Sequence, residues 1–576
     1  MRVTHIADRE SISREDCNDC SFLLTNRKGG YAWFSSIPQS RYGGVFFVEK
    51  SRLFRVIENI GMKGNTRELL NRFWSVERVK DRNIENFFMP YGYNSIAYEN
   101  DGSTADLSLN LRESYSQGKA SYSLEKESTT NFILLKCRLN EEDFYIAIKL
   151  EGTYKINSIH FEREYDFDKK RGSPPYSLEV YDFAEINGKL TVISFSSSKE
   201  NAIKECNYVF SNLGMLKEKQ KKEVSKLFYN RIEDKELSMA YNSARVSLYN
   251  LSVGEKGLYA GLPWFFQFWA RDELISLKSL NEINSQNLKE AIFDRWLFDA
   301  VNRNKTSANI DLFGNKNGIS ADSLGWLFKR LNTVKISKER IELLESIANM
   351  NTEFASNESN ETWMDSFERK GSRIEMQALK LCIFDAMHEL TKNDIYRINK
   401  DILNSEVRKK FFNDSFLLDS PSDTTARPNS FIAYYIYPKL LKQEEWDKCF
   451  SHSIEKLWCE WESGGGFSTV DKSSPLFVCE HTGQNSKSYH NGDSWFWLNN
   501  LAAICLARVE KEKFREKIMK ISKASTEDIL WNGAIANASE ISSAKELSSN
   551  GCISQSWSAA MFIELVNEMI YSKIII

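Results

Sequence analysis

The charged run Lys217-Glu-Lys-Gln-Lys-Lys-Glu223 marks the point where this chain of 576 residues changes its pattern. Before it, short runs of aromatic and β-branched residues alternate with turn residues, which is typical of β-strands. After it, apolar residues recur at helical spacing through the rest of the chain. Because a charged run usually forms a solvated helix face, we interpret residues 216–240 as a linker helix between two parts of different architecture.

The part before the linker, residues 1–215, is predicted to be a β-domain. Turn residues separate its apolar runs, and Asn187-Gly188 is the clearest hairpin signal because Asn and Gly readily take the positive φ of a type I′ turn. Many short strands at close spacing favour a β-sandwich. The expected strands include residues 44–48, 132–137, 144–148 and 190–195.

The part after the linker, residues 241–576, is predicted to be helical. No sequence period of 30 to 50 residues recurs, which argues against a solenoid. A helical bundle and a closed ring of six hairpins remain alternatives that periodicity does not separate. The expected helices include residues 285–303, 337–350, 375–390, 428–441, 444–458, 493–506 and 555–570.

Composition excludes several classes of function. A net charge of -3 gives no sign of a nucleic-acid partner. The first residues lack the apolar core of a signal peptide, and no window reaches the roughly 18 apolar residues of a membrane span, so we expect no membrane partner. Ten scattered Cys are typical of reduced thiols, which favours a cytoplasmic location. Cys17 and Cys20 have metal-ligand spacing without further ligands nearby, and no phosphate-binding or dinucleotide-binding loop occurs, so we expect neither a metal nor a cofactor.

Five loops of the helical part carry aromatic and charged residues where Ser, Gly and Lys would suffice for a connection. In the first, Arg271 and Asp272 precede an apolar helix. Together with Trp264 and Trp269 they predict a sugar clamp, in which hydrogen-bonding groups face hydroxyls and flat rings wall the sugar. The alternative is a helix N-cap by Asp272.

The second loop, Thr362-Trp-Met-Asp365, supplies a candidate acid. Trp363 adjoins Asp365, and desolvation by the indole can raise the pKa of this carboxyl. Its alternative is an exposed loop acid. The other loops and the helix that follows supply a second acid, Glu540, whose alternative is a surface glutamate. The candidate sugar contacts of these loops are Trp363, Glu375, Gln377, Arg427, Asn429, Tyr489, His490, Gln555 and Trp557.

Taken in order, these loops resemble the C-terminal glucosidase domain of glycogen debranching enzymes, the amylo-α-1,6-glucosidase family. The family's motif Ala-Gly-x-Pro-Trp-Phe…Trp-Gly-Arg-Asp is matched at residues 260–272, and its Thr-Trp-Met-Asp at 362–365. Its later motifs are matched at residues 374–379, 427–429, 489–495 and 551–558. The β part is similar to the family's own in Phe22-Leu-Leu-Thr-Asn-Arg-Lys-Gly-Gly-Tyr31 and in Glu162-Arg-Glu-Tyr-Asp166.

The resemblance implies a β-sandwich followed by an (α/α)6 barrel, a toroid of six helical hairpins. It implies that Asp365 is the general acid and Glu540 the general base of an inverting hydrolysis of α-1,6 branch points in glycogen or limit dextrin. The stretch after Glu540 departs from the family pattern, and Glu546 is the nearest alternative base. Ala270 replaces a usual Gly, and Arg41-Tyr-Gly-Gly-Val-Phe46 lacks a usual His.

Two other functions remain open at this point. One is a glucoamylase-like exo-glycosidase acting on linear oligosaccharides, and the other is a glycan-binding protein without activity. The sequence predicts no oligomeric state.

Overall fold

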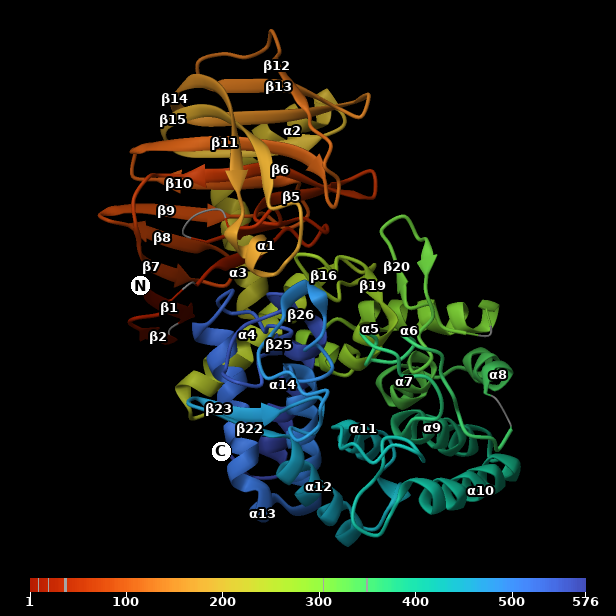
Figure 1. The fold of residues 1–576 in the computed structure, drawn as a ribbon. Helices are drawn as coiled ribbons and strands as arrows, with labels where there is room; N and C mark the ends of the chain where they lie inside the picture. The colour runs from red at the N-terminus through yellow and green to blue at the C-terminus, as the bar shows by residue number, and fades with distance from the viewer. Residues whose placement is uncertain (9, 19, 36–38, 304, 349–350, 576) are drawn as a thin grey trace. The chain divides into compact units, whose positions relative to one another are not determined.

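The computed structural model describes residues 1–575 except 9, 19, 36–38, 304 and 349–350 (Figure 1). The described residues form two compact units. The first, called the β unit, comprises Met1–Asn230, Asp234–Gly254 and Ile529–Asn537. The second, called the helical unit, comprises Arg231–Glu233, Glu255–Asp528 and Ala538–Ile576. None of the described helices combines the length and the apolarity that a membrane span requires.

Among the described residues, fifteen strands of the β unit form one hydrogen-bonded sheet. Its main path runs in the order β2-β1-β7-β8-β9-β10-β15-β11-β6-β5-β4-β3, and β12, β13 and β14 branch from β15. The strands are β1 (Arg2–Ala7), β2 (Glu10–Arg14), β3 (Phe22–Thr25), β4 (Tyr31–Phe34), β5 (Gly44–Glu49), β6 (Arg52–Gly61), β7 (Thr66–Asn71), β8 (Val76–Lys80), β9 (Asn83–Phe88), β10 (Ser95–Asn100), β11 (Thr104–Glu113), β12 (Ser121–Leu124), β13 (Phe132–Leu139), β14 (Glu142–Glu164) and β15 (Ser177–Ser196). The expected strands at 44–48, 132–137, 144–148 and 190–195 are therefore confirmed.

The sheet folds over on itself around an aromatic core. Phe22 of β3 and Phe34 of β4 lie with their ring centroids 5.1 and 5.2 Å from Phe87 of β9. In the hydrogen-bonded order β9 stands far from both of those strands. The two arms of the sheet therefore meet face to face, and their aromatic side chains fill the space between them.

The predicted hairpin turn at Asn187-Gly188 is wrong. Both residues lie inside β15, where Gly188 is paired with Gly152 and Asn187 with Thr153 of β14. A Cβ at Gly188 would stand 2.4 Å from the carbonyl oxygen of Glu151. This glycine thus permits a close approach of two long strands, and the sequence signal for a turn arose from that steric need.

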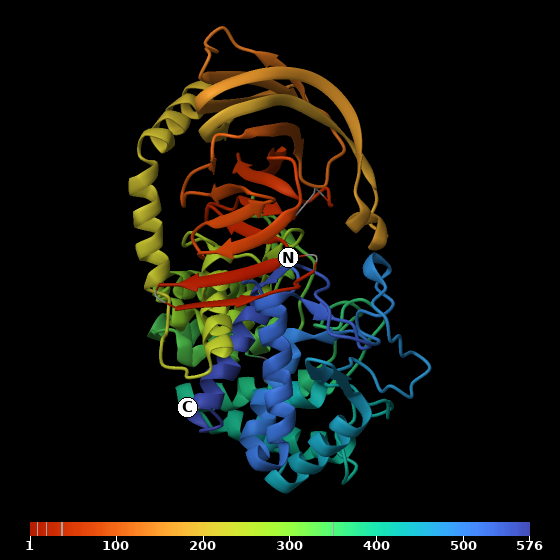
Figure 2. The same cartoon turned by 90° about the vertical axis from the view of Figure 1, so that its left-hand side faces the viewer.

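Helical structure begins earlier than the sequence pattern indicated. Helix α2 (Lys199–Ser211) starts where Ser198 Oγ accepts a hydrogen bond from the Asn201 N–H, and it packs on β14 and β15. Figure 2 shows α2 and the following α3 (Leu213–Ser225) along one side of the sheet. The stretch predicted as a linker helix, 216–240, corresponds to α3 and the start of α4 (Lys235–Leu251), because Asp234 caps a new helix by accepting from the Leu237 N–H at 2.9 Å.

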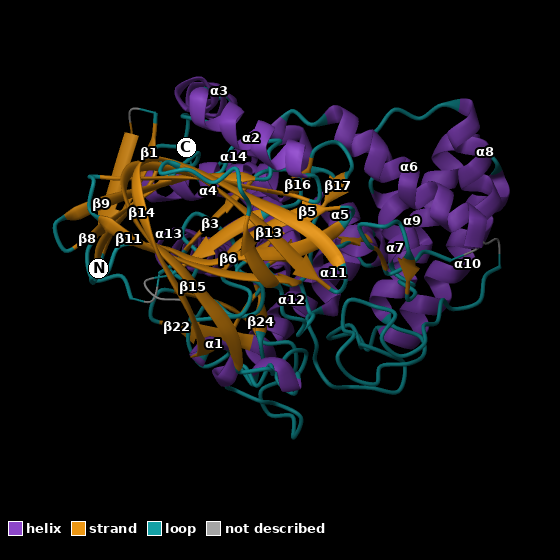
Figure 3. Ribbon diagram, turned by 90° about the horizontal axis from the view of Figure 1, so that it is seen from above, coloured by secondary structure: helices purple, strands orange, loops and turns teal. Residues whose placement is uncertain are grey.

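The helical unit contains most of the remaining helices, drawn in purple in Figure 3. The helices not yet named are α1 (Asp166–Lys170) in the β unit, and α5 (Ala270–Ser276), α6 (Gln286–Arg303), α7 (Ser323–Lys329), α8 (Lys338–Ile347), α9 (Ile374–Thr391), α10 (Asp394–Phe411), α11 (Asn429–Ile436), α12 (Gln443–Leu457), α13 (Phe496–Trp531) and α14 (Ser556–Tyr571). Short strands, β16 (Ser252–Val253), β17 (Gly257–Leu258), β18 (Gly261–Leu262), β19 (Phe268–Trp269), β20 (Asn309–Ile310), β21 (Lys316–Asn317), β22 (Trp458–Trp461), β23 (Gly464–Phe467), β24 (Ser494–Trp495), β25 (Ile541–Ser542) and β26 (Ser554–Gln555), pair in the loops.

Each expected helix of this part has a counterpart, with three differences. The helix predicted over 493–506 begins as α13 at Phe496 and continues to Trp531 across a break at Glu510, where φ is -156°. The helix predicted over 428–441 ends as α11 at Ile436, because Tyr437 precedes Pro438 and takes an extended φ of -138°. The helix predicted over 337–350 ends as α8 at Ile347, and residues 349 and 350 lie outside the described part of the chain.

Candidate active site

Asp365 lies in the loop between α8 and α9, opposite the first turn of α5. Its Oδ2 is 3.5 Å from Nη1 of Arg271, and 35% of the side chain is exposed. Burial raises the pKa of Asp365 to about 6, although the positive charge of Arg271 opposes this shift. The carboxyl is therefore crowded by protein atoms, reaches solvent, and can carry a proton near neutral pH.

Asp322 holds both Arg271 and the backbone of the loop that carries Asp365. It accepts a hydrogen bond from Nε of Arg271 at 2.8 Å and another from the backbone N–H of Trp363 at 3.0 Å. The Asp322 side chain is 2% exposed. Sequence reasoning missed it, because Ser320-Ala-Asp322 carries none of the aromatic signals of the other loops.

The Trp363 indole is buried beneath this loop. Its Nε1 donates to Oδ1 of Asn429 at 2.8 Å. Three rings surround it in edge-to-face contacts, those of His490, Trp495 and Trp497. With 2% of its surface exposed, Trp363 holds the loop of Asp365 in place and presents little face to a ligand.

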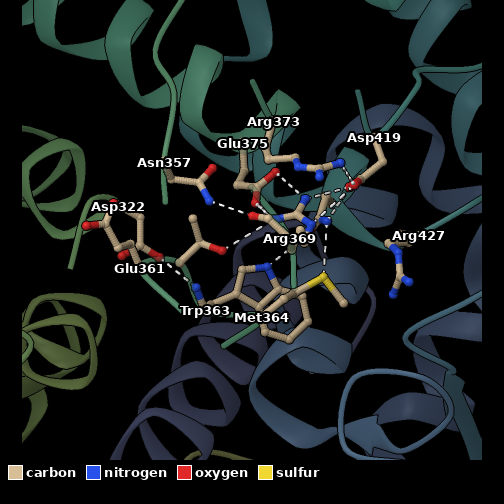
Figure 4. A network of polar contacts seen from close by, with 12 residues as sticks. Asp322, Asn357, Glu361, Trp363, Met364, Arg369, Arg373, Glu375, Asp419 and Arg427 are labelled. Carbon is tan, nitrogen blue, oxygen red and sulfur yellow. Dashed lines mark hydrogen bonds and ion pairs between the residues drawn. The ribbon is translucent and has the colours of Figure 1, made fainter. Parts of the chain in front are cut away.

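A buried network of charges lies behind Trp363 (Figure 4). Arg369 binds Glu375 on one side and Asp419 on the other, at 3.1 Å and 2.6 Å from its Nη2. Nδ2 of Asn429 donates to the same Asp419 at 2.6 Å, which links the network to Trp363. The carboxylate of Glu375, a predicted sugar contact, is therefore engaged by an arginine inside the protein.

Two further predicted sugar contacts bind backbone atoms. Gln377 accepts from the N–H of Ala355 at 2.9 Å and donates to its carbonyl at 2.7 Å. Arg427 donates to the carbonyl oxygens of Thr469 and His490 at 3.0 and 2.8 Å. Both side chains are more than nine-tenths buried, so in this structure they hold loops together.

Glu540 is 2% exposed, and both of its carboxylate oxygens accept hydrogen bonds. The Tyr489 hydroxyl donates to Oε1, and the backbone N–H of Cys552 donates to Oε2 at 2.8 Å. The alternative base, Glu546, is exposed. Burial and two donors distinguish Glu540 from a surface glutamate.

Electrostatics connect the two candidate acids. The pKa of Tyr489 is raised well above its usual value, first by burial, then by the negative charge of Glu540, with Asp365 adding to it. Asp272 is buried beside them, and burial raises its pKa to about 8 against the opposing charge of Arg271, with Glu540 contributing to the rise. Nε2 of Gln555 donates to Asp272 at 2.9 Å. These residues form one cluster, in which Glu540 acts on Asp272, and both Glu540 and Asp365 act on Tyr489.

His490 is a buried, neutral side chain. Its Nδ1 lies 2.7 Å from Oγ of Ser366, and its ring stacks on Trp495 at 4.9 Å. Burial, and then the charge of Arg427, lower the pKa of His490 well below its usual range. The imidazole therefore supports the residue that follows Asp365.

The remaining predicted aromatic contacts differ in exposure. Trp264 and Trp557 are buried, and Trp557 stacks on Trp497 at 4.8 Å. Trp269 is half-buried, with its ring edge-on to Phe265 at 5.8 Å. Of these three predicted tryptophans, Trp269 has the most surface to offer a sugar.

The described residues contain no group of three or more His, Cys, Asp or Glu that could hold a metal ion.

Comparison with known proteins places this geometry in context. Residues 343–564 match the model of a family described as amylo-alpha-1,6-glucosidase. A bacterial glucoamylase in complex with acarbose is similar in structure, with a TM-score of 0.68 over 97% of this chain and 96% of that chain, at 11% sequence identity. No curated protein matches the sequence significantly.

Two further solved structures are less similar. A glycosidase variant in complex with glucose has a TM-score of 0.44 at 11% identity, covering 60% of this chain and 100% of that chain. An α-mannosidase from Bacteroides thetaiotaomicron in complex with mannoimidazole has a TM-score of 0.47 at 12% identity, covering 94% and 77%. The glucoamylase likeness shows a shared fold.

Proposed function

We propose, from the premise that residues 343–564 belong to the amylo-alpha-1,6-glucosidase family and form a glycoside hydrolase domain, that this chain hydrolyses α-1,6-glucosidic branch points of glycogen or limit dextrin and releases glucose. The observation that carries the proposal is the contrast between two carboxyl groups of one cluster. Asp365 has a raised pKa and reaches solvent, whereas Glu540 is buried under two hydrogen-bond donors. Hydrolysis of an acetal needs one protonated and one ionised carboxyl group.

Asp365 is the general acid of this mechanism. It transfers its proton to the glycosidic oxygen as the bond from that oxygen to the anomeric carbon breaks. A pKa of about 6 leaves about a tenth of Asp365 protonated at pH 7 and about half at pH 6. Arg271, at 3.5 Å, stabilises the carboxylate that remains after the transfer.

Glu540 is the general base. It takes a proton from a water molecule that attacks the anomeric carbon on the face opposite the leaving oxygen, so the configuration inverts. The Tyr489 hydroxyl and the Cys552 N–H favour the ionised form of Glu540, because both donate to its oxygens. Such a mechanism needs carboxyl groups roughly 6.5–9.5 Å apart, which leaves room for the water.

Substrate binding is assigned to the surface around these acids. Trp269 offers a half-buried ring for a sugar face. Arg271 and Asp272, which the sequence predicted as sugar contacts, are more than nine-tenths buried and engaged by Asp322 and Gln555, so they act by positioning. The other residues predicted to bind sugar act by positioning: Trp264, Trp363, Glu375, Gln377, Arg427, Asn429, Tyr489, His490, Gln555 and Trp557.

The domain boundaries and the type of each domain are also inferred. We infer that residues 1–215 form a β-sandwich, 216–240 a linking segment, and 241–576 an (α/α)6 barrel whose loops carry the site. The glucoamylase likeness supports this arrangement.

One alternative activity is a glucoamylase-like exo-glycosidase on linear oligosaccharides, which the same likeness favours. Another alternative is glycan binding without hydrolysis, prompted by the altered sequence after Glu540.

Glucose release from phosphorylase limit dextrin, maltose and pullulan separates these functions. Debranching predicts glucose from limit dextrin and little from maltose. The reverse order would establish the exo-glycosidase, and binding without any glucose release would establish the inactive protein. Proton NMR of the first product should show β-glucose, and α-glucose as the first product would contradict inversion.

A further inference from the structure

Arg112 is a buried arginine of the β unit without an acidic partner. It lies on β11 and is 6% exposed. Its Nε donates to Oδ1 of Asn110 at 2.6 Å, and its Nη2 donates to the carbonyl oxygen of Glu179 at 3.1 Å. Both acceptors are neutral, and no carboxylate of the described residues lies within ion-pair distance. A buried charge in this state is costly unless another charge offsets it.

The neighbouring charges leave a positive excess. Glu58 is completely buried and already faces two arginines, Arg55 at 2.7 Å and Arg163 at 3.3 Å. Asp168 is the nearest acid to Arg41, at 3.7 Å. Four guanidinium groups, including that of Arg112, thus share two carboxylates.

These charges change the pKa of Arg112. Burial, and then the positive charge of Arg55, lower the pKa of Arg112 below its usual value. Glu58 raises the pKa of Arg112, but by less than Arg55 lowers it.

A small cavity borders these arginines. Its volume is about 20 Å³, and its lining includes Arg41, Arg55, Arg112, Ser114 and Gln117. It also includes Glu113, whose carboxylate lies 3.6 Å from Nη1 of Arg52. A cavity needs about 10–15 Å³ to accept one water-sized guest. The space therefore suits a monatomic ion and is too small for a phosphate or a sugar.

A hydroxyl group of the lining lacks a partner. Oγ of Ser114 is buried without a hydrogen-bond partner in the described part of the chain. Such a group can donate to an anion, as guanidinium groups do.

We propose that this cavity binds one small monovalent anion, of the size of chloride, between Arg41 and Arg112. The anion offsets the excess positive charge of the cluster, and Ser114 is placed to donate to it. It ties β11 to two segments that the proposed hydrolysis does not use. These are Arg41-Tyr-Gly-Gly-Val-Phe46 and the loop at Pro175, whose residues line the same cavity.

Thermal unfolding of the full chain tests the site. Sodium chloride is compared with sodium gluconate at equal ionic strength, because gluconate is too large for the cavity. We expect Tm to rise with chloride by about 2–4 °C once its concentration exceeds the dissociation constant several-fold, and then to follow the logarithmic dependence of a ligand that binds only the folded state. Equal Tm values in the two salts would overturn the proposal.

The variant Arg112→Gln should abolish the difference between chloride and gluconate. Arg138→Gln is the matched control, because Arg138 is an exposed arginine on β13, and it should retain the difference. If Arg112→Gln retains the chloride effect, the effect comes from another site and the assignment fails.

A crystal of the unchanged protein soaked in bromide gives an answer even where Arg112→Gln does not fold. We expect an anomalous peak beside Nη1 or Nη2 of Arg112. Absence of that peak at saturating bromide would contradict the proposal, and so would phosphate that stabilises the protein when chloride does not. Hydrolytic activity enters none of these measurements, so their outcome is independent of the proposed function.

Discussion

The hydroxyl group of Tyr489 donates a hydrogen bond to Oε1 of Glu540, and this contact joins two loops that are 51 residues apart. The backbone N–H of Cys552 occupies the other oxygen at 2.8 Å. Glu540 is therefore held at both oxygens. The two groups that orient it transfer no proton in the proposed hydrolysis. Tyr489 acts as a positioning residue for the base.

Tyr489→Phe tests this role. A hydrogen bond to a charged group is worth about 1.5–3 kcal/mol, so we expect kcat to fall about 10- to 100-fold with a smaller change in KM. The acidic limb of the pH profile should move to higher pH, because the ionised form of Glu540 loses a donor. Steady-state kinetics on limit dextrin across pH measures both effects.

The control for this variant is Tyr571→Phe, since Tyr571 is 85% exposed on the same unit. It should match the unchanged protein in kcat and in pH profile. A Tyr489→Phe variant with reduced stability but an unmoved acidic limb would show that Tyr489 supports the fold alone.

The sequence predicted the features of the fold that depend on neighbouring residues, but not those that depend on contacts between distant parts of the chain. Local patterns located the strands at 44–48 and 132–137 and the helices that became α6, α9 and α14, because periodicity reports which face of an element is buried. The Asn187-Gly188 turn failed because Gly188 serves a contact with another strand. A glycine signal alone does not distinguish a turn from a close approach.

In the candidate site, too, local motifs were recognised in the sequence and long-range contacts were not. Sequence motifs named loops that lie together in the structure, and most of the residues that they named belong to one cluster. Asp322 and Asp419 were missed, because their importance comes from partners far along the chain, Arg271 and Arg369. Roles were also less direct than the motifs implied, since Glu375 is engaged by Arg369.

The pH profile should report the acid. Because Asp365 must be protonated to act, kcat/KM should fall about tenfold per pH unit as pH rises above its pKa of about 6. Asp365→Asn should lower kcat by about 10²- to 10⁴-fold and remove this alkaline limb.

Asp272→Asn provides the discriminating comparison. The pKa of Asp272 is raised to about 8, so a limb near that pH would point to Asp272. If Asp272→Asn abolishes the alkaline limb while Asp365→Asn keeps it, the two aspartates have exchanged roles and the assignment of the acid is wrong.

Arg369 should matter for stability. Arg369→Met would leave Glu375 buried without its cation and Asp419 with Arg373 alone at 3.3 Å, and breaking a buried pair of this kind costs about 3–5 kcal/mol. We expect a corresponding loss in the free energy of unfolding in urea. Arg397→Met is the control, because Arg397 forms an exposed pair with Asp394 and should change stability by less than about 1 kcal/mol. Equal losses in the two variants would refute a special role for the buried network.

Gly551 gives the most direct test of the placement of Glu540. A Cβ at Gly551 would lie 2.3 Å from Oε2 and 2.9 Å from Cβ of Glu540, so Gly551→Ala must displace the base. Its φ of +68° adds a backbone cost of about 1 kcal/mol for any residue with a Cβ. Gly314→Ala separates the two effects, since Gly314 has a φ of +91° and nothing within 4 Å of its Cβ position. Both variants should show the backbone cost in stability, and Gly551→Ala should add the cost of its contact with Glu540. Only Gly551→Ala should lose kcat, by at least about tenfold if the displaced carboxylate loses one hydrogen bond. An active Gly551→Ala enzyme would mean that the base is a residue other than Glu540, and the exposed Glu546 would then be the next carboxylate to replace.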